Sequence, residues 1–241
     1  MRDGSLSLGL LAALETLRIS APTVADALLG RSTRSACDRR LADWSRRVLA
    51  EAAIDLAVEG QEHLPTSPET FVLMSNHQSH FDIPVLFQAF PRCMRMVAKT
   101  ELFRIPIFGG AVRAAEFIEV DRHDKERARQ SIALARARLE SGLNVWIAPE
   151  GTRSATGRLG PFKKGGFVLA LDTGARILPM TIEGTRFVLP PHTLAVRRGQ
   201  RVIVRFHPPV DPAAYGYARR DELVATVRAA VASGLPEELR G

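Results

Sequence analysis

The chain has 241 residues, of which 46% are hydrophobic and 24% are charged, so it is long enough to bury a substantial core in one globular domain. Its formal net charge of +7 favours acidic partners such as phosphorylated small molecules or an anionic membrane surface. We do not expect nucleic acid as a partner, because aromatic residues make up only 6% of the chain and the basic residues are scattered along it.

The N-terminal segment, residues 1–53, is predicted to be helical and to precede the main domain. Its longest apolar runs, residues 6–14 and 19–29, fall short of the ~18 to 20 consecutive apolar residues that a membrane span requires. The second run also contains a proline and an aspartate, and the beginning of the chain resembles a signal peptide only weakly. Cys37 and Cys93 form no CxxC pair, which indicates a reducing compartment. We therefore expect a peripheral or monotopic protein at the cytoplasmic face of the cell membrane.

Within this segment, residues 35–53 carry the pattern of an amphipathic helix. A capping-box-like Ser35-Ala36-Cys37-Asp38 marks its predicted start. One face is apolar and the other basic: the residues are Leu41, Trp44, Val48, Leu49 and Ala52 against Arg39, Arg40, Arg46 and Arg47. Such a helix can lie in a membrane interface, attracted by anionic headgroups, or it can pack its apolar face on the domain core. The sequence leaves both alternatives open.

Beyond residue 53, short runs rich in β-branched and aromatic residues alternate with stretches of helical periodicity. Predicted strands cover residues 54–58, 71–75, 94–98, 117–120, 145–148, 177–182 and 202–206, and predicted helices cover residues 83–90, 128–139, 165–171 and 223–231. This alternation is typical of an α/β fold. Residues 54–241 are expected to form a single domain with a largely parallel mixed sheet flanked by helices. Sites in such sheets lie beyond the carboxyl ends of strands.

The first polar cluster follows the predicted strand 71–75 and contains His77 and Asp82. An aspartate at the start of the next helix can reach back to one imidazole nitrogen, which fixes the tautomer and leaves the other nitrogen free to accept a proton. This is the base-and-orienter half of a serine-protease triad, with a substrate hydroxyl in place of the serine. The spacing alone leaves two alternatives open. Asp82 can be a helix N-cap, or His77, His80 and Asp82 can be metal ligands.

The second polar cluster follows the predicted strand 145–148. It comprises Pro149-Glu150-Gly151-Thr152-Arg153-Ser154 and, after a flexible stretch, Pro161-Phe162-Lys163-Lys164-Gly165-Gly166. An arginine fork, a lysine and the N–H groups of a glycine-rich helix start together suit a phosphate. A solvated loop with a glycine turn is the alternative.

Arg122 and Lys99 are further candidates for anion contact at the same edge of the sheet, because each follows a predicted strand. For Arg122, a surface ion pair with Asp121 or Asp124 is the alternative. For Lys99, an ordinary surface position without a ligand is likewise the alternative.

Taken in order, these motifs resemble the glycerolipid acyltransferases typified by lysophosphatidic acid acyltransferase. Within residues 45–210 the matching stretches are Asn76-His77-Gln78-Ser79-His80-Phe81-Asp82, Phe117-Ile118-Glu119-Val120-Asp121-Arg122, Pro149-Glu150-Gly151-Thr152-Arg153-Ser154, Phe162-Lys163-Lys164-Gly165 and Ile177-Leu178-Pro179-Met180. The pair of His77 and Asp82 is a weak signal by itself, whereas the ordered set is specific. The resemblance therefore favours the catalytic interpretation over the helix cap.

The resemblance implies direct acyl transfer from a thioester donor, acyl-CoA or acyl-carrier protein, to a hydroxyl of a lysolipid, with no acyl-enzyme, no cofactor and no metal. His77 would be the general base, and Asp82 would orient it and stabilise the imidazolium. Arg153 would help to bind the acceptor's phosphate, and Pro179 would shape the acyl-binding side. The implied substrate-binding residues are Glu150, Gly151, Thr152, Arg153, Arg122 and Lys163.

One departure from the family pattern bears on the acceptor. The second motif usually opens with a glycine, whereas Ala114, Ala115 and Glu116 precede Phe117 here, so the register of Arg122 is less well defined than that of Arg153. We expect 1-acyl-sn-glycerol 3-phosphate as the acceptor and phosphatidic acid as the product. The alternatives are the same chemistry on another lysolipid, such as a lyso-aminolipid, or a non-catalytic lipid-binding module at the membrane surface.

Overall fold

The computed structural model describes residues 4–64, 68–121 and 125–241 and contains one mixed sheet, whose strands run in the order β1-β7-β6-β2-β5-β3-β4. The strands are β1 (Asp55–Glu59), β2 (Phe71–Ser75), β3 (Met94–Lys99), β4 (Ile118–Val120), β5 (Asn144–Ile147), β6 (Arg176–Glu183) and β7 (Arg201–Phe206). β7 pairs antiparallel with β6, and the other neighbouring strands pair in parallel. All seven predicted strands and the predicted α/β class are confirmed.

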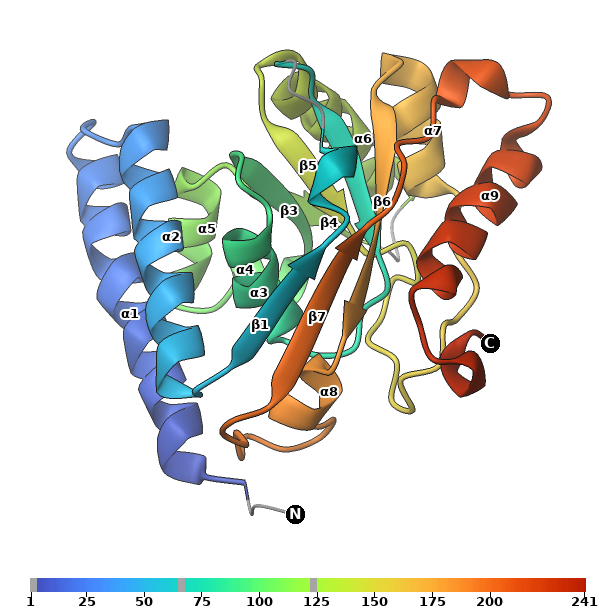
Figure 1. Ribbon diagram of the computed structural model, residues 1–241. Helices are drawn as coiled ribbons and strands as arrows, with labels where there is room; N and C mark the ends of the chain where they lie inside the picture. Colours follow the sequence, from blue (N-terminus) through green and yellow to red (C-terminus); the bar gives the residue numbers. More distant parts are fainter. Residues whose placement is uncertain (1–3, 65–67, 122–124) are drawn as a thin grey trace.

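Helices cover both faces of the sheet (Figure 1). They are α1 (Leu6–Leu28), α2 (Arg34–Glu51), α3 (Asp82–Ala89), α4 (Thr100–Phe103), α5 (Phe108–Ala114), α6 (Lys125–Glu140), α7 (Gly165–Thr173), α8 (Thr185–Val188) and α9 (Arg220–Ser233). α2 and α3 pack together on one face, with α1 outside them, while α6, α7 and α9 cover the other. The four helices predicted after residue 53 correspond to α3, α6, α7 and α9.

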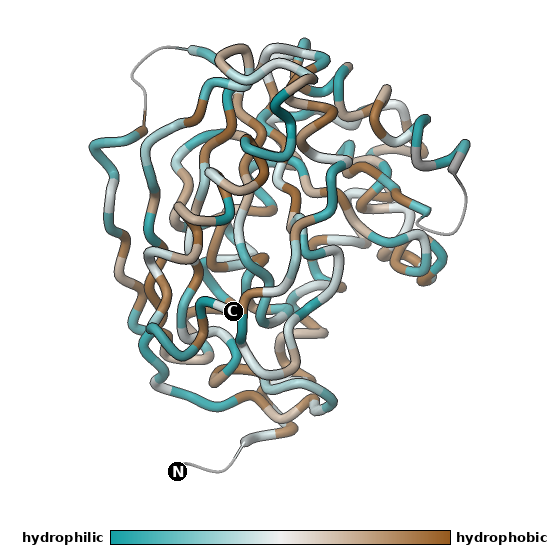
Figure 2. Tube along the Cα trace, turned by 90° about the vertical axis from the view of Figure 1, so that its right-hand side faces the viewer, coloured by the Kyte–Doolittle hydropathy of each residue, from teal (hydrophilic) through white to brown (hydrophobic). Residues whose placement is uncertain are grey.

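The alternation of side chains along β2 shows why both faces are covered. Phe71 and Leu73 belong to the core under α2 and α3, and Val72 and Met74 belong to the core under α6 and α7. All four are fully buried. A parallel strand that is apolar on both sides requires cover on both sides, which the crossover helices provide. Figure 2 shows the resulting alternation of hydrophobic and hydrophilic stretches along the chain.

α2 packs on the domain rather than presenting its apolar face to the outside. Val48 and Leu49 are buried in the core, and the Trp44 ring meets Phe87 edge-on with ring centroids 6.4 Å apart. The Trp44 Nε1–H also donates to Thr16 Oγ1 of α1 at 3.0 Å. Of the two alternatives for this helix, packing is therefore correct.

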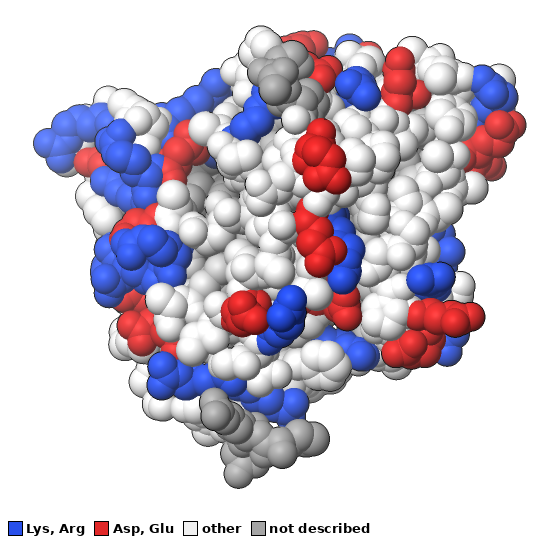
Figure 3. Space-filling view, viewed as in Figure 1, with Lys and Arg blue, Asp and Glu red and all other residues white. Residues whose placement is uncertain are grey.

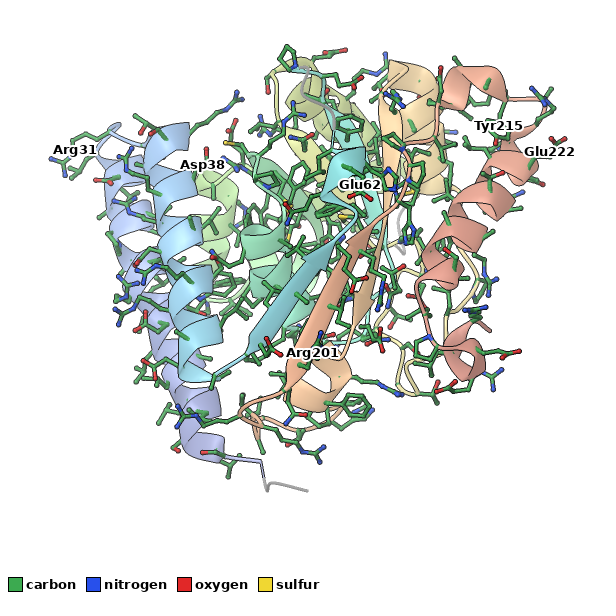
Figure 4. All side chains as sticks on the ribbon, viewed as in Figure 1. Arg31, Asp38, Glu62, Arg201, Tyr215 and Glu222 are labelled. Atoms are coloured by element: carbon green, nitrogen blue, oxygen red, sulfur yellow. The ribbon has the colours of Figure 1, made fainter. Side chains whose placement is uncertain are left out.

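Side-chain contacts define where α2 begins and how it is attached to the sheet. The predicted Ser35 capping box is wrong: Thr33, whose backbone is extended, is the N-cap and accepts from the Ala36 N–H at 3.2 Å. Further along, Asp38, labelled in Figure 4, accepts from Nη1 of the fully buried Arg95 of β3 at 2.7 Å. This ion pair, between a fully buried guanidinium and a half-buried carboxylate, joins α2 to β3, the strand next to the edge of the sheet.

α1 is one continuous helix of 23 residues, not two short apolar runs. By length and composition it meets the requirement for a membrane span, as core helices and signal sequences also do. The expectation that no N-terminal segment is long enough is therefore wrong. The proline and the aspartate of the second apolar run do not end the helix. Pro22 lies within it, and Asp26 is paired with Arg40 of α2 at 2.5 Å.

The polarity of α1 is inverted relative to a surface helix of a soluble protein. Its buried side chains are the polar Glu15, Ser20 and Thr23. Its outer face carries leucines that are 45% to 83% exposed: Leu6, Leu10, Leu14, Leu17 and Leu28. Soluble helices place apolar side chains inward, so this face is suited to an apolar medium.

Glu15 holds the polar interface between the two N-terminal helices. Its carboxylate accepts from Arg47 of α2 at 2.7 and 2.8 Å and from Arg18 at 2.7 Å. The hydrogen bond from Arg47, with further help from Arg18, lowers the pKa of Glu15 to about 2 against the opposing effect of burial. A carboxyl whose pKa is depressed on folding stabilises the fold above its unfolded pKa of 4.5, and this contribution is lost as the pH falls from 4.5 towards 2.

Replacing this carboxyl by an amide, Glu15→Gln, tests the ion pair. At pH 7 we expect a loss of about 1 kcal/mol in the free energy of unfolding, because both arginines are more than 40% exposed and water screens the pair. The difference from the wild type should shrink as the pH falls through the window between 4.5 and 2. Urea denaturation at pH 7 and pH 3 measures both effects. Glu140→Gln, at an exposed position of α6, is the control, and equal effects of the two variants would contradict the assignment.

Candidate active site

The loop that carries His77 leaves the sheet at the carboxyl end of the buried strand β2 and is held by side chains of its own. The Asn76 amide donates to Ile182 O and accepts from Ile182 N, both at 2.8 Å, so a side chain continues the β2–β6 pairing. The Ser79 hydroxyl donates to Leu189 O at 3.0 Å and accepts from the Phe81 N–H at 3.2 Å. The loop is therefore fixed at both ends.

His77 and Asp82 form the pair that the sequence predicts. His77 Nδ1 lies 2.6 Å from Asp82 Oδ2. The aspartate is fully buried, whereas the histidine side chain is 17% exposed. Since an ionised carboxylate can only accept, Nδ1 carries the proton in this bond. No hydrogen bond within the described ranges uses Nε2, so the nitrogen turned away from Asp82 is left to act as a base.

Asp82 does not cap its own helix. The N-cap of α3 is Phe81, and no side chain bonds the first turn. Besides the imidazole, Asp82 Oδ2 accepts from the backbone N–H groups of Gln78 at 2.8 Å and Ser79 at 3.1 Å, both in the preceding loop. The helix-cap alternative is therefore wrong, because the carboxylate organises the loop of His77.

The second cluster closes over the backbone of His77. Glu150 Oε1 accepts from the His77 N–H and Oε2 accepts from the Gly160 N–H, both at 2.8 Å. The Ser154 N–H donates to His77 O at 2.8 Å. Burial raises the pKa of Glu150, while the two N–H donors act in the opposite direction. Glu150 thus joins the two motifs through its two carboxyl oxygens.

Two basic side chains lie at this junction. Gly151 has a φ of +76°, which favours glycine at this turn, and the Lys163 side chain crosses it, with Nζ 2.8 Å from where a Cβ would lie. Arg153 is half-buried, and its positive charge adds to desolvation in lowering the pKa of His80, at the outer edge of the site, to about 4. His80 is therefore neutral near pH 7.

The other candidates that the structure describes differ in exposure and pairing. Lys164 pairs with Asp221 of α9 at 2.7 Å, which leaves Lys163 as the lysine of the junction. Thr152 is exposed, and Lys99 is exposed at the end of β3. Arg122 lies outside the described residues. As for the metal alternative, the described part of the chain has no group of three or more His, Cys, Asp or Glu side chains that could hold a metal ion.

Two side chains at this site were not singled out from the sequence. The Trp146 ring of β5 meets the His77 imidazole edge-on, with ring centroids 5.7 Å apart, and its Nε1–H donates to Ser75 Oγ at 3.0 Å. The Thr185 hydroxyl donates to Asp82 Oδ1 at 2.5 Å. Thr185 follows the predicted strand 177–182, so the rule that sites lie beyond carboxyl ends of strands could have found it. Trp146 lies within a predicted strand, where an apolar residue gives no such signal.

With this geometry in place, the chain was compared with known proteins. The family model described as Acyltransferase matches residues 55–183, more than half of the 241 residues. The chain is 36% identical over 153 residues to a chloroplastic 1-acyl-sn-glycerol-3-phosphate acyltransferase of Arabidopsis thaliana, which covers 64% of this chain and 43% of the relative. It is also 36% identical over 142 residues to a 1-acyl-sn-glycerol-3-phosphate acyltransferase of Pseudomonas aeruginosa, which covers 58% and 53%. The chain spans about half the length of the curated relatives it matches.

A solved structure extends the likeness to the whole fold. The crystal structure of the 1-acyl-sn-glycerophosphate acyltransferase of Thermotoga maritima superposes with a TM-score of 0.75 at 28% identity, and the match covers 94% of each chain. The matched segment of the family model runs from β1 to the end of β6 and includes His77, Asp82 and Arg153. The chain belongs to the acyltransferase family.

Proposed function

We propose that this protein transfers a fatty acyl group from a thioester donor to the free hydroxyl of 1-acyl-sn-glycerol 3-phosphate and so forms phosphatidic acid. The observation that carries the proposal is the His77–Asp82 pair, with Nδ1 held 2.6 Å from a fully buried carboxylate and Nε2 unoccupied by any described residue. The similarity to the Arabidopsis, Pseudomonas and Thermotoga acyltransferases supports this choice of reaction.

The proposed reaction needs one base and no covalent enzyme intermediate. His77 Nε2 removes the proton of the acceptor hydroxyl while the oxygen attacks the thioester carbonyl. The tetrahedral intermediate collapses, the carbon–sulfur bond breaks, and the imidazolium returns its proton to the departing thiolate. Asp82 stabilises the imidazolium through Nδ1. A positioned imidazole of this kind is typically worth roughly 10² to 10⁴-fold in rate.

The acceptor's phosphate is assigned to the basic junction of the second cluster. Arg153 and Lys163 lie on the loop whose backbone bonds His77, so a phosphate there would be held beside the catalytic imidazole. Glu150, Gly151 and Thr152 shape this loop, and Arg122 would add to its charge. The donor would be acyl-CoA or acyl-carrier protein, and neither a cofactor nor a metal enters the proposal. If the acceptor were a lysolipid without phosphate, this charge would have no partner on the acceptor.

We further propose that the protein is monotopic at the cytoplasmic face of the membrane and that α1 makes the contact. The outer face of α1 is apolar, while its polar face is bonded to α2. A helix bonded laterally in this way lies along the bilayer surface with one face in lipid. Figure 3 shows Arg side chains gathered over α1 and α2, with Asp and Glu side chains among them, where the arginines would meet anionic headgroups.

The variant His77→Ala tests the catalytic role of the pair. We expect kcat to fall at least 10²-fold while vesicle binding and thermal stability stay close to wild type, because the imidazole acts on the reacting proton. Thioester release over a panel of lysolipids, with both donor types, is the measurement. His63→Ala removes an imidazole that precedes β2, whereas His77 follows this strand, and it should leave turnover intact. Full turnover by His77→Ala would favour the alternative of a non-catalytic lipid-binding module.

The variant Arg153→Ala tests the phosphate site. We expect KM for 1-acylglycerol 3-phosphate to rise about 10- to 100-fold, the loss expected when a hydrogen bond to a charged group is removed. KM for a 1-acylglycerol lacking the phosphate should not change. Arg158→Ala, at an exposed position of the same loop, is the matched control. An unchanged KM for the phosphorylated acceptor would argue for another lysolipid.

Replacing two leucines of the outer face, Leu10→Ser and Leu17→Ser together, tests the membrane contact. We expect partitioning onto vesicles to weaken about tenfold or more, because apolar surface no longer enters the acyl boundary. Added salt should weaken binding to anionic vesicles more than to neutral ones. Flotation with vesicles of both kinds measures the effect. Tyr217→Ser, an exposed position far from α1, is the control, and equal flotation of both variants would remove α1 from this role.

A further inference from the structure

The carboxylate of Asp82 is bonded on both oxygens, and the two oxygens differ in what holds them. Oδ2 receives His77 Nδ1 and the backbone N–H groups of Gln78 and Ser79, all from its own loop. Oδ1 receives the hydroxyl of Thr185 at 2.5 Å, across a sequence separation of 103 residues. A carboxylate can only accept, so Thr185 is the donor and uses its single hydroxyl proton in this hydrogen bond.

Thr185 is held in place by the backbone around it. Its side chain is fully buried. The residue before it, Gly184, has a φ of +97°, and a Cβ there would lie 2.3 Å from Arg201 O of the neighbouring strand β7. Only glycine permits this close turn from β6 into α8. Because Asn76 joins the loop of His77 to Ile182 of β6, Thr185 and Asp82 are fixed to the same strand ends.

This arrangement determines what removal of the hydroxyl would do. Without Thr185 Oγ1, Oδ1 would be a buried acceptor with no partner, and the carboxylate could rotate about its Cβ–Cγ bond to seek one. Such a rotation would carry Oδ2 away from His77 Nδ1. The proton could then move to Nε2, the nitrogen that has to accept the proton of the acceptor hydroxyl.

We propose that Thr185 is a positioning residue for the acyl-transfer reaction: its hydroxyl fixes the Asp82 carboxylate so that His77 is kept in the tautomer with Nδ1 protonated and Nε2 free. Thr185, Asp82 and His77 form a hydrogen-bonded chain drawn from two strand ends. The inference rests on the proposed function, in which His77 is the base. It adds a residue that acts on the base through Asp82 and does not touch the substrate.

The test compares Thr185→Val, which keeps the shape and removes the hydroxyl, with Thr185→Ser, which keeps the hydroxyl. We expect T185V to lower kcat about 10- to 100-fold with KM within about twofold, and T185S to stay within about threefold of wild type. Nitrogen-15 spectra of histidine-labelled protein report the tautomer directly, with the His77 signal identified by its absence in H77A. In T185V a population protonated at Nε2 should appear, and in T185S it should not.

Thr181→Val is the matched control. Thr181, in β6, is likewise a fully buried threonine, but its hydroxyl donates to Val231 O at 2.6 Å and lies 2.8 Å from His207, away from Asp82. T181V should cost comparable stability without changing the His77 tautomer. A tautomer and kcat in T185V equal to those of T181V would overturn the inference, as would a T185S as impaired as T185V. Should T185V fail to fold, T185A and T185S carry the same comparison.

The two proposals fail in different ways. If H77A keeps full turnover, the proposed function fails, while the tautomer of His77 in T185V still reports on the hydrogen-bonded chain. If H77A is inactive and T185V matches wild type in both kcat and tautomer, the role of Thr185 fails and the proposed function stands. Thermal melting of every variant separates both outcomes from loss of folding.

Discussion

The site depends on the pairing of one side chain with one backbone position. β2 ends at Ser75, and the Asn76 amide makes with Ile182 the two hydrogen bonds that a further strand residue would have made. The backbone is therefore free to turn out of the sheet while the strand end stays fixed to β6. His77 is the first residue after this clamp, and Glu150 and Ser154 bond its backbone from the other side. A loop bonded in this way can hold an imidazole in one orientation at little further cost in conformational entropy.

The buried charges around His77 are arranged so that none is left unbalanced. Asp82 is surrounded by four hydrogen-bond donors, and Glu150 by two backbone N–H groups. Buried carboxylates remain compatible with a stable fold when hydrogen-bond donors compensate the lost water. Because these donors are backbone N–H groups, the His77 imidazole and the Thr185 hydroxyl, the positive charges of Arg153 and Lys163 are not paired with either carboxylate. They remain available for a ligand.

The sheet and much of the site could be predicted because both correspond to local patterns in the sequence. Alternating β-branched runs identified all seven strands, and the polar residues after β2 and β5 identified His77, Asp82 and the loop of Glu150. The features that the sequence did not predict depend on tertiary contacts. Thr185 is an ordinary threonine until the fold brings it to Asp82. The apolar face of α2 proved to be an interior face, because its register on α3 and β3 is set by packing and by the buried pair of Asp38 and Arg95.

The position of α1 links the proposed membrane contact to the chemistry of the proposed function. Ser5, at the start of α1, exchanges backbone hydrogen bonds with Val196, and Arg197 N donates to Val188 O at the end of α8. α8 begins at Thr185. Its last residue is followed by Leu189, whose carbonyl oxygen accepts a hydrogen bond from the Ser79 hydroxyl in the His77 loop. The start of α1 and α8 lie at the same end of the molecule (Figure 1).

The outer leucines of α1 therefore begin beside the strand ends that carry His77 and Asp82. A lysolipid held in the bilayer by its acyl chain would present its hydroxyl and phosphate at this depth, without first leaving the membrane. Extracting such a chain into water would cost about 0.8 kcal/mol for each CH₂ group, so a site at the level of the headgroups avoids the largest unfavourable term in binding. In the proposed function, the inverted polarity of α1 and the placement of His77 and Asp82 would serve one requirement, namely that the base meets an acceptor whose acyl chain stays in lipid.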